Sequence, residues 1–449
     1  MEFTVESLTI DFGIMSLLLI FAKIMRTKIK ILQNFYVPTA LIAGILGVIL
    51  GKYGFDILPF SSQASSYSGY LFNLLFASLF IGKAVEGKAS FFSKLKKSGD
   101  SVCLTISGFT GLYGVAAVVG ATILVFFFDD IYYGFGVLAA TGFAGGHGSA
   151  AALGTAFQAS GWGPGLDVAN TFATIGLLVG VFAGVALIKY ATNKKYTQII
   201  DKVEKLPEDV RTGLIKKEQQ VPLATETVSS MSIETLAWHF ALIIASATVG
   251  ILFNKYVMKE LIPDLIFPDY TFALIFGVII FFILEKVGYS EYIDKKTINH
   301  LGAGITDYLV GFGVAMINIQ IVLDYWLALL IMCVIVTLLN VFYLFFISRR
   351  LYNTYWFERG IYTFGMYTGV ASIGVLLLRV VDPEYKTGAL EDIGVSLIAL
   401  TPVEMVIVSM TPIMFIQGFG LVWGLVMLAT SILALVLCKL FFTKKSHNK

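Results

Sequence analysis

Long apolar stretches recur along the whole chain and are separated by short polar segments. Each stretch holds about 20 residues, enough to cross about 30 Å of hydrocarbon as an α-helix. The runs are too long and continuous for tilted membrane strands, and helices satisfy their own backbone groups in lipid. The pattern predicts about eleven membrane-spanning helices. They are expected near residues 7–25, 36–53, 69–85, 101–128, 168–190, 235–257, 268–285, 302–323, 325–347, 393–416 and 418–441.

Two further apolar stretches, about 134–160 and 360–381, are rich in glycine and small polar residues. We interpret them as re-entrant hairpins or broken helices. Lysine and arginine cluster in alternate loops, and positively charged short loops stay in the cytoplasm. If residues 134–160 enter and leave from the outside, the N-terminus lies outside, and the central loop and the C-terminus are cytoplasmic.

This topology inverts the second half of the chain relative to the first. Residues 1–190 form the first repeat, 191–232 a cytoplasmic linker, 233–416 the second repeat, and 417–449 an additional C-terminal helix with a basic tail. The run Ala-Leu-Ile-Ala-Gly at 40–44 matches Ala-Leu-Ile-Phe-Gly at 273–277, in helices that the topology makes equivalent. The predicted fold is therefore an all-α polytopic membrane protein with two inverted repeats of about five helices, each containing a hairpin.

Composition supports a bilayer location and narrows the partners. Of the 449 residues, 57% are hydrophobic and 14% are charged, and the net charge is +2. This small charge gives no electrostatic reason to expect a nucleic-acid partner. Paired, glycine-interrupted segments in inverted halves are instead typical of secondary transporters that bind substrate near the membrane midplane.

The first interrupted segment holds the strongest local candidate site, at residues 141–150. Its glycines, Gly145, Gly146 and Gly148, permit positive φ and close backbone approach. A turn at membrane depth exposes N–H groups that suit a carboxylate and carbonyls that suit sodium. Ser149 and Thr141 add hydroxyls, and His147 is either a ligand or a hydrogen-bonded structural residue. The alternative for the cluster is that its glycines only let helices pack closely.

The second interrupted segment is the topological counterpart of the first. Thr368, Gly369 and Ser372 could bind substrate there, and Arg379 follows them. The planar fork of an arginine matches a carboxylate. Alternatively, Arg379 caps the hairpin at the cytoplasmic surface and pairs with Asp382 or Glu384.

Polar residues in the neighbouring spans are candidates for a sodium site. Besides Thr141 and Ser149, they are Asn170, Thr171, Thr174, Asp307 and Glu404. Ionisable groups inside a membrane are costly and therefore suggest function. For Asp307 and Glu404, structural pairing remains an equal alternative.

The sequence resembles the bacterial sodium/glutamate symporter family. The run Gly145-Gly146-His147-Gly148-Ser149-Ala150 is similar to the family's G-G-H-G-[ST]-x-A signature, and Val37-Pro38 and residues 167–176 are similar to flanking segments. The resemblance implies sodium-driven uptake of L-glutamate or a similar small carboxylate across the inner membrane. It also implies a homodimer, with sodium as the coupling ion and no other cofactor. The second loop departs from the family pattern, because residues 362–369 contain no histidine.

Other classes of protein fit less well. The motifs of metal or serine intramembrane proteases and of nucleotide-driven pumps are absent from the sequence, so an enzyme is not expected. A proton-coupled carboxylate transporter or a cation/proton antiporter is the main alternative, since these also use broken helices. We expect a moving domain built from the hairpins and the spans that follow them, with spans 36–53 and 268–285 in a static scaffold.

Overall fold

A computed structural model of the chain describes residues 4–35, 37–79, 81–82, 98–200, 212–223, 225–262, 269–352, 354–382 and 386–442. These residues form helices joined by turns. The first half contains α1 (Val5–Lys28), α2 (Lys30–Asn34), α3 (Thr39–Leu50), α4 (Tyr67–Ser78), α6 (Gly99–Val119), α7 (Val125–Phe127), α8 (Phe135–Ala159) and α9 (Gly165–Asn193).

The second half contains a similar series of helices. They are α11 (Thr235–Phe253), α12 (Lys259–Leu261), α13 (Asp269–Lys286), α14 (Lys295–Ala315), α15 (Ile319–Asp324), α16 (Trp326–Phe342), α17 (Arg349–Leu351), α18 (Trp356–Val381), α19 (Ala389–Ile416) and α20 (Gly420–Leu437). Wider π-helical turns extend α6, α11, α16 and α20 at their C-terminal ends.

Seven helices in the described part of the chain are long and apolar enough to cross a membrane. The prediction of an all-helical, multi-pass membrane protein is therefore confirmed. α3 is shorter, because its 12 residues span only about 18 Å at 1.5 Å per residue. Part of the predicted span 69–85 lies outside the described residues, since α4 ends at Ser78.

The predicted span at 302–323 was placed wrongly. α14 instead covers Lys295–Ala315, and a turn separates it from the short α15. The start of α14 is polar, so hydropathy alone did not reveal it. Its N-cap residue, Asp294, accepts hydrogen bonds from the backbone N–H groups of Lys296 and Thr297 at 3.2 Å each. Asn318 caps the next helix, α15, by accepting a hydrogen bond from the backbone N–H of Gln320. The two caps mark where α14 and α15 begin.

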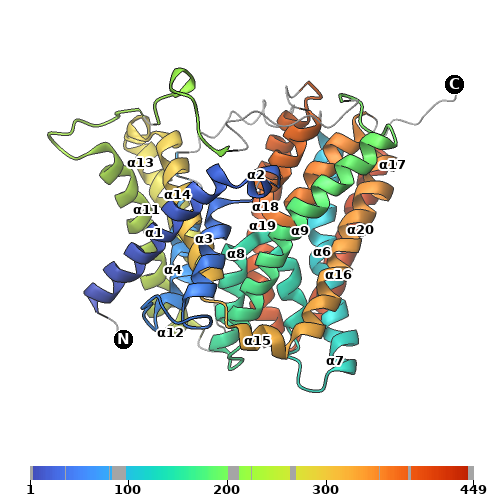
Figure 1. The fold of residues 1–449 in the computed structure, drawn as a ribbon, viewed down its shortest axis with the longest axis horizontal. Coiled ribbons are helices and arrows are strands. Elements are labelled where there is room, and N and C mark those ends of the chain that lie inside the picture. The colour runs from blue at the N-terminus through green and yellow to red at the C-terminus, as the bar shows by residue number, and fades with distance from the viewer. Residues whose placement is uncertain are drawn as a thin grey trace.

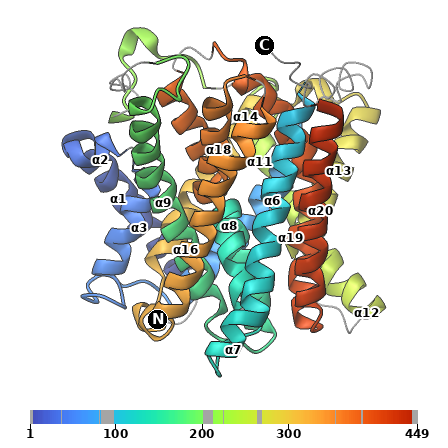
Figure 2. The ribbon, with the colours of Figure 1, turned by 90° about the vertical axis from the view of Figure 1, so that its right-hand side faces the viewer.

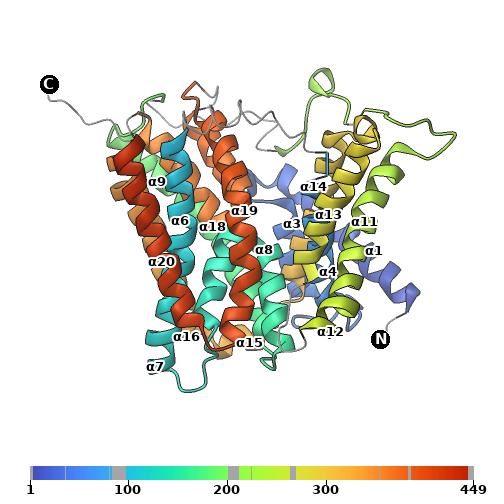
Figure 3. The same cartoon turned by 180° about the vertical axis from the view of Figure 1, so that it is seen from behind.

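The helices form two groups that lie side by side (Figure 1; Figure 3 shows the same division from behind). One group, called here the flanking group, contains α1, α3, α4, α11, α13 and α14. The other, called the crossing group, contains α6, α8, α9, α16, α18, α19 and α20. α8 lies against both α4 and α14, so the groups meet along this helix. α6, α19 and α20 lie next to one another in the crossing group (Figure 2).

Glycines allow very close helix packing in the crossing group. A Cβ atom placed on Gly120 would lie 2.6 Å from the Cα of Gly136, where α6 meets α8. A Cβ on Gly154 would lie 2.7 Å from the carbonyl oxygen of Gly165, where α8 meets α9. Small residues commonly permit such backbone approach in membranes. These contacts hold α8 firmly between its neighbours.

Candidate functional site

α8 changes direction at Gly146. This residue has φ 63° and ψ −164°, a conformation accessible essentially only to glycine. The flanks of α8 then lie side by side, because a Cβ on Gly134 would be 2.6 Å from Cζ of Phe157 and the rings of Tyr132 and Phe157 are 5.0 Å apart. In a straight helix, positions 134 and 157 would be about 34 Å apart.

α18 changes direction at Gly369 and Val370. Gly369 has φ −144° and ψ 32°, and Val370 has φ 66° and ψ 169°. The chain folds back there, since a Cβ on Gly365 would lie 2.7 Å from Cα of Gly374, against about 13 Å in a continuous helix. Positive φ is a strained conformation for a β-branched residue. Strain of this kind concentrates at functional sites.

The two breaks face each other. A Cβ atom on Gly146 would lie 2.6 Å from Cγ1 of Val370. α9 packs beside both breaks, because Gly176 and Gly180 lie against Thr368 and Gly180 also lies against Gly369. Four helix ends of the crossing group therefore converge at one place.

His147 and Asn170 present two unsatisfied acceptors beside the break in α8. Thr174 Oγ1 donates to the carbonyl of Asn170 at 2.9 Å, so it accepts from His147 Nε2 at 2.9 Å. This arrangement places the histidine proton on Nε2 and leaves a lone pair on Nδ1. Nδ1 and Asn170 Oδ1 are both buried without a hydrogen-bond partner among the described residues. Such groups are costly to bury unless something else binds them.

The same residues face the flanking group. A Cβ atom on Gly313 of α14 would lie 3.2 Å from Cδ2 of His147 and 3.5 Å from Asn170 Oδ1. Gly148 lies against the ring of Phe72 on α4. The break in α8 is therefore located where the two helix groups meet.

Several predicted hydroxyl ligands bond to their own helices. Thr141, Thr171 and Thr368 each donate to the carbonyl four residues earlier, at 3.0, 2.7 and 2.7 Å. Ser149 lies beside Gly145, within the hairpin tip of α8. The side chain of Ser372 lies outside the described atoms.

The predicted charged residues, Arg379, Asp307 and Glu404, have three different surroundings. Arg379 lies in the last turn of α18, nine residues beyond Val370, which corresponds to about 13 Å along a helix. Asp307 lies within electrostatic reach of Lys23 on α1. Glu404 lies on α19, near the buried hydroxyls of Tyr113 and Tyr367. Tyr367 lies two residues before Gly369, so Glu404 is within electrostatic reach of a residue beside the break in α18.

The alternative partners predicted for Arg379 are Asp382 and Glu384. Asp382 accepts hydrogen bonds from the backbone N–H groups of Lys386 and Thr387, at 2.8 and 3.0 Å, and from the hydroxyl of Thr387. Its carboxylate therefore closes the turn after α18 instead of pairing with Arg379. Glu384 lies outside the described residues.

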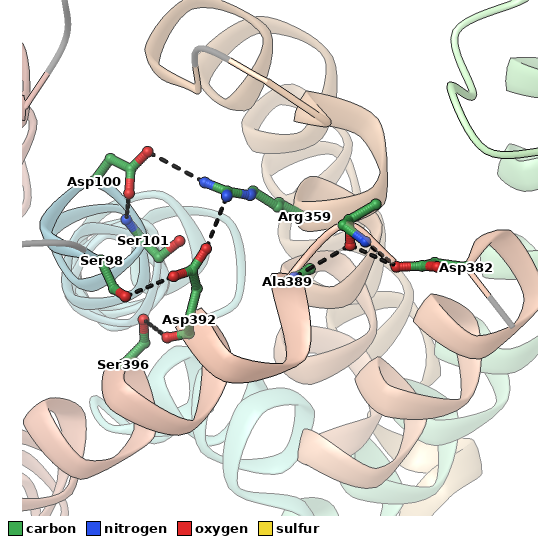
Figure 4. A network of polar contacts seen from close by, with 9 residues as sticks. Ser98, Asp100, Ser101, Arg359, Asp382, Ala389, Asp392 and Ser396 are labelled. Carbon is green, nitrogen blue, oxygen red and sulfur yellow. Dashed lines mark hydrogen bonds and ion pairs between the residues drawn. The ribbon is translucent and has the colours of Figure 1, made fainter. Parts of the chain in front are cut away.

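A charged cluster that the sequence analysis missed joins the ends of three helices of the crossing group (Figure 4). Arg359 at the start of α18 bridges Asp100 of α6 at 3.3 Å and Asp392 of α19 at 2.8 Å. Ser98 donates to Asp392 at 2.6 Å. No local sequence pattern marks this cluster, because Asp100 is 259 residues from Arg359 and the second hairpin separates Arg359 from Asp392. The cluster thus joins the start of α18 to the starts of α6 and α19.

A cleft of about 300 Å³ opens between the two helix groups, on the side where α8 begins and ends. Tyr70 and Asn73 of α4, Thr155 and Gln158 of α8 and Tyr270 of α13 are among its lining residues. The cleft thus follows the returning arm of α8, residues 147–159, which starts at the break. Polar groups line its walls on both sides.

These features define a multi-pass helical membrane protein in which two interrupted helices meet at an internal polar site, the arrangement typical of secondary transporters. The family comparison agrees. The chain matches the sodium/glutamate symporter family over residues 5–374, which is most of its length, and it belongs to that family. No individual curated protein compared with the chain matches it.

Proposed function

We propose that this protein couples sodium movement to the uptake of glutamate or a similar anionic amino acid, and that both ligands bind between the two helix breaks. Family membership supports the transport class. The observation that carries the location is the pair of buried, unpartnered acceptors, His147 Nδ1 and Asn170 Oδ1, beside the break in α8. An amino acid carries an ammonium group and the coupling ion is a cation, so both ligands need such acceptors.

The substrate carboxylates are assigned to helix N-termini. Residues 147–159 start at the break in α8 and residues 371–381 start at the break in α18, so two N-termini meet. Each offers unpaired N–H donors and the positive end of a helix dipole. Ser149 and Thr368 lie in the tips and complete this half of the site. Arg379 is too far along α18 to share it and is assigned to the open end of the hairpin.

The two acceptors are given different ligands. Nitrogen with a free lone pair suits an N–H donor, so His147 Nδ1 is assigned to the substrate ammonium. Sodium prefers oxygen and binds in transporters to carbonyls freed at interrupted helices. It is therefore assigned to Asn170 Oδ1 together with carbonyls at the end of residues 135–145. Sodium and substrate then neutralise each other's charge, and each raises the affinity for the other.

Two contacts between helices of opposite halves support an inverted repeat. Gly44 of α3 packs against Val314 of α14, and its equivalent, Gly277 of α13, packs against Ala77 of α4. If α3 corresponds to α13 and α4 to α14, each contact becomes the other under a two-fold operation. The breaks in α8 and α18 are related in the same way, as hairpins from opposite faces. We assign the crossing group to the moving domain and the flanking group to a dimeric scaffold.

Orientation follows from the basic loops. The connection after α9 and the ends of α13, α16 and α20 lie together at one face, opposite the N-terminus (Figure 1). The sequence segments that follow these helices are rich in lysine and arginine. Positively charged short loops stay in the cytoplasm, so we assign this face to the cytoplasmic side of a bacterial inner membrane. The cleft beside α8 then opens to the outside.

Uptake by reconstituted protein tests the proposal. Proteoliposomes would be given radiolabelled L-glutamate with an inward sodium gradient, an inward proton gradient or no gradient. Accumulation is expected only with sodium. Accumulation driven by protons alone would instead identify a proton-coupled carboxylate transporter, and counterflow of protons against sodium without glutamate would identify an antiporter.

A matched pair of variants tests the location. Asn170→Ala removes the unpartnered oxygen and is expected to raise the sodium concentration for half-maximal uptake by about tenfold, equivalent to one lost hydrogen bond or ion contact of about 1.4 kcal/mol. Thr171→Val changes the next residue, whose hydroxyl bonds to its own helix. It should leave the sodium dependence unchanged. Equal behaviour of the two variants would place the sodium site elsewhere.

A further inference from the structure

A groove of about 760 Å³ lies at the C-terminal ends of α9 and α16, at the face that the proposed function assigns to the cytoplasm. Two consecutive arginines, Arg349 and Arg350, form its charged part. Leu187 and Tyr190 of α9 and Phe346 of the π-helical turn η6 (Tyr343–Ser348) form its apolar part. None of the lining residues belongs to the helix breaks of α8 and α18, and the proposed transport mechanism does not use the groove.

Aromatic rings hold both guanidinium groups in place. The Cζ atom of Arg349 lies 5.3 Å from the ring centre of Tyr196 and 5.7 Å from that of Trp356. Cζ of Arg350 lies 5.4 Å from the ring of Phe346, and its Nη1 donates to the Phe346 carbonyl at 3.0 Å. Stacking of this kind engages the face of a guanidinium and leaves N–H donors at its edge.

Neither arginine has an ion pair among the residues that the structure describes. Glu358 lies just after Trp356 in the chain, but it is fully buried and its Oε1 accepts from the backbone N–H of Gln198 at 2.6 Å. Two exposed positive charges therefore line the groove. An occupant should carry a negative charge that both can reach.

The rest of the groove requires an apolar occupant. Both α9 and the helix containing Trp326–Leu351 are membrane-span candidates, and the groove lies at their ends. Tyr190 and Phe346 remain 49% and 50% exposed, which is ordinary for rings at a membrane interface. A free phosphate ion would gain nothing from these rings. An anionic phospholipid would use both parts, because it joins a phosphate to acyl chains.

We propose that this groove binds an anionic phospholipid of the cytoplasmic leaflet. The headgroup phosphate lies between Arg349 and Arg350, and an acyl chain runs along Phe346 and Leu187 into the bilayer. Basic pockets between helices on the cytoplasmic side are suited to such headgroups. Because α9 also carries Asn170, the lipid is bound to a helix of the sodium site.

Native mass spectrometry of the purified protein in detergent tests the proposal. The protein would be titrated with phosphatidylglycerol and, separately, with phosphatidylcholine of the same acyl chains. Phosphatidylglycerol is expected to bind more tightly. The double variant Arg349→Gln, Arg350→Gln should weaken its binding about thirtyfold, since each basic residue at an anionic lipid contributes a factor of about five.

Controls separate this site from general charge. Lys286→Gln combined with Lys296→Gln removes two exposed charges at the cytoplasmic ends of α13 and α14, and phosphatidylglycerol binding should change less than twofold. Arg349→Lys with Arg350→Lys keeps the charges but loses the planar stacking, and binding should be intermediate. Folding of each variant is checked by its elution volume and thermal unfolding.

Three results would overturn the proposal. One is equal binding of phosphatidylcholine and phosphatidylglycerol, which would show that the charge is not recognised. Another is an equal loss of phosphatidylglycerol binding in the Arg349→Gln, Arg350→Gln variant and in the Lys286→Gln, Lys296→Gln control. The third is displacement of phosphatidylglycerol by inorganic phosphate at similar concentration, which would identify a site for a soluble anion.

Discussion

Substitution of Gly146 by alanine tests the contact between the two helix breaks. Two costs can be worked out from the structure. Gly146 has φ 63° and ψ −164°, and a side chain in this conformation costs about 1–3 kcal/mol. The new Cβ would also lie 2.6 Å from Cγ1 of Val370, and such overpacking costs about 1–3 kcal/mol. The sum is about 2–6 kcal/mol, concentrated at the tips.

We therefore expect Gly146→Ala to lower the initial rate of sodium-driven glutamate uptake at least thirtyfold, which corresponds to about 2 kcal/mol. Rates would be normalised to the amount of folded protein in the liposomes. Gly161→Ala provides the matched control. Gly161 also has positive φ, 106°, but nothing lies within 4 Å of its Cβ position, and it belongs to the turn between α8 and α9. This variant carries backbone strain and should retain uptake.

A double-mutant cycle with Val370 isolates the contact itself. Val370→Ala removes Cγ1, and Cβ of residue 370 lies 4.0 Å from the new Cβ at 146, an ordinary contact distance. The double variant should therefore recover the overpacking part, about 1–3 kcal/mol, and keep only the backbone strain. Additive effects of the two substitutions, within about 0.5 kcal/mol, would show that the tips do not meet as described.

Three further predictions concern other parts of the molecule. Thr174→Val removes the acceptor of His147 Nε2 and should cost about 1–3 kcal/mol, seen as weaker glutamate affinity in an uptake titration; unchanged affinity would contradict the proposed role of the histidine. Arg359→Gln leaves two largely buried carboxylates unpaired and should lower thermal stability by about 3–5 kcal/mol, whereas Arg350→Gln should not. Asp294→Ala should cost about 0.5–2 kcal/mol as a lost helix cap. Burial acts to raise the pKa of Asp294, but hydrogen bonds from a neighbouring hydroxyl and backbone N–H groups outweigh it and lower the pKa. The stabilisation by the Asp294 carboxylate is therefore fully present above the pKa of an unfolded aspartate, about 3.9. It is lost as the pH falls through the lower pKa of the folded state, so the stabilities of the parent protein and of Asp294→Ala should converge in acid.

The sequence predicted the class of fold because its cause is local. Each long apolar run must become a helix in lipid, whatever surrounds it, since the backbone groups have no other partners. The glycine cluster at residues 142–148 likewise marks the place where α8 turns, because Gly146 occupies a conformation that other residues avoid. The predicted segment 134–160 differs from α8 by one residue at each end. The polar start of α14 was missed because its cause is not local: the burial of these residues depends on their neighbours in the fold and not on their own hydropathy.

The composition of the site was decided by tertiary structure. Asn170, Thr174 and His147 were all candidates in the sequence, but only packing brought them together and left two acceptors unsatisfied. Packing also placed Asp307 within reach of Lys23, and Arg379 lies in the last turn of α18. No local pattern marks Val370 or Gly313, because their importance comes from the residues that they face across the chain.

The sequence by itself thus determined that the chain is a multi-pass helical membrane protein and where one helix must break, because these depend on the solvent and on single-residue backbone freedom. Only the tertiary structure decided which helix ends meet, which buried acceptors lack a partner and which cations lie against aromatic rings. Those outcomes depend on distances of a few ångströms between residues far apart in sequence. Such distances follow from the packing of the whole molecule.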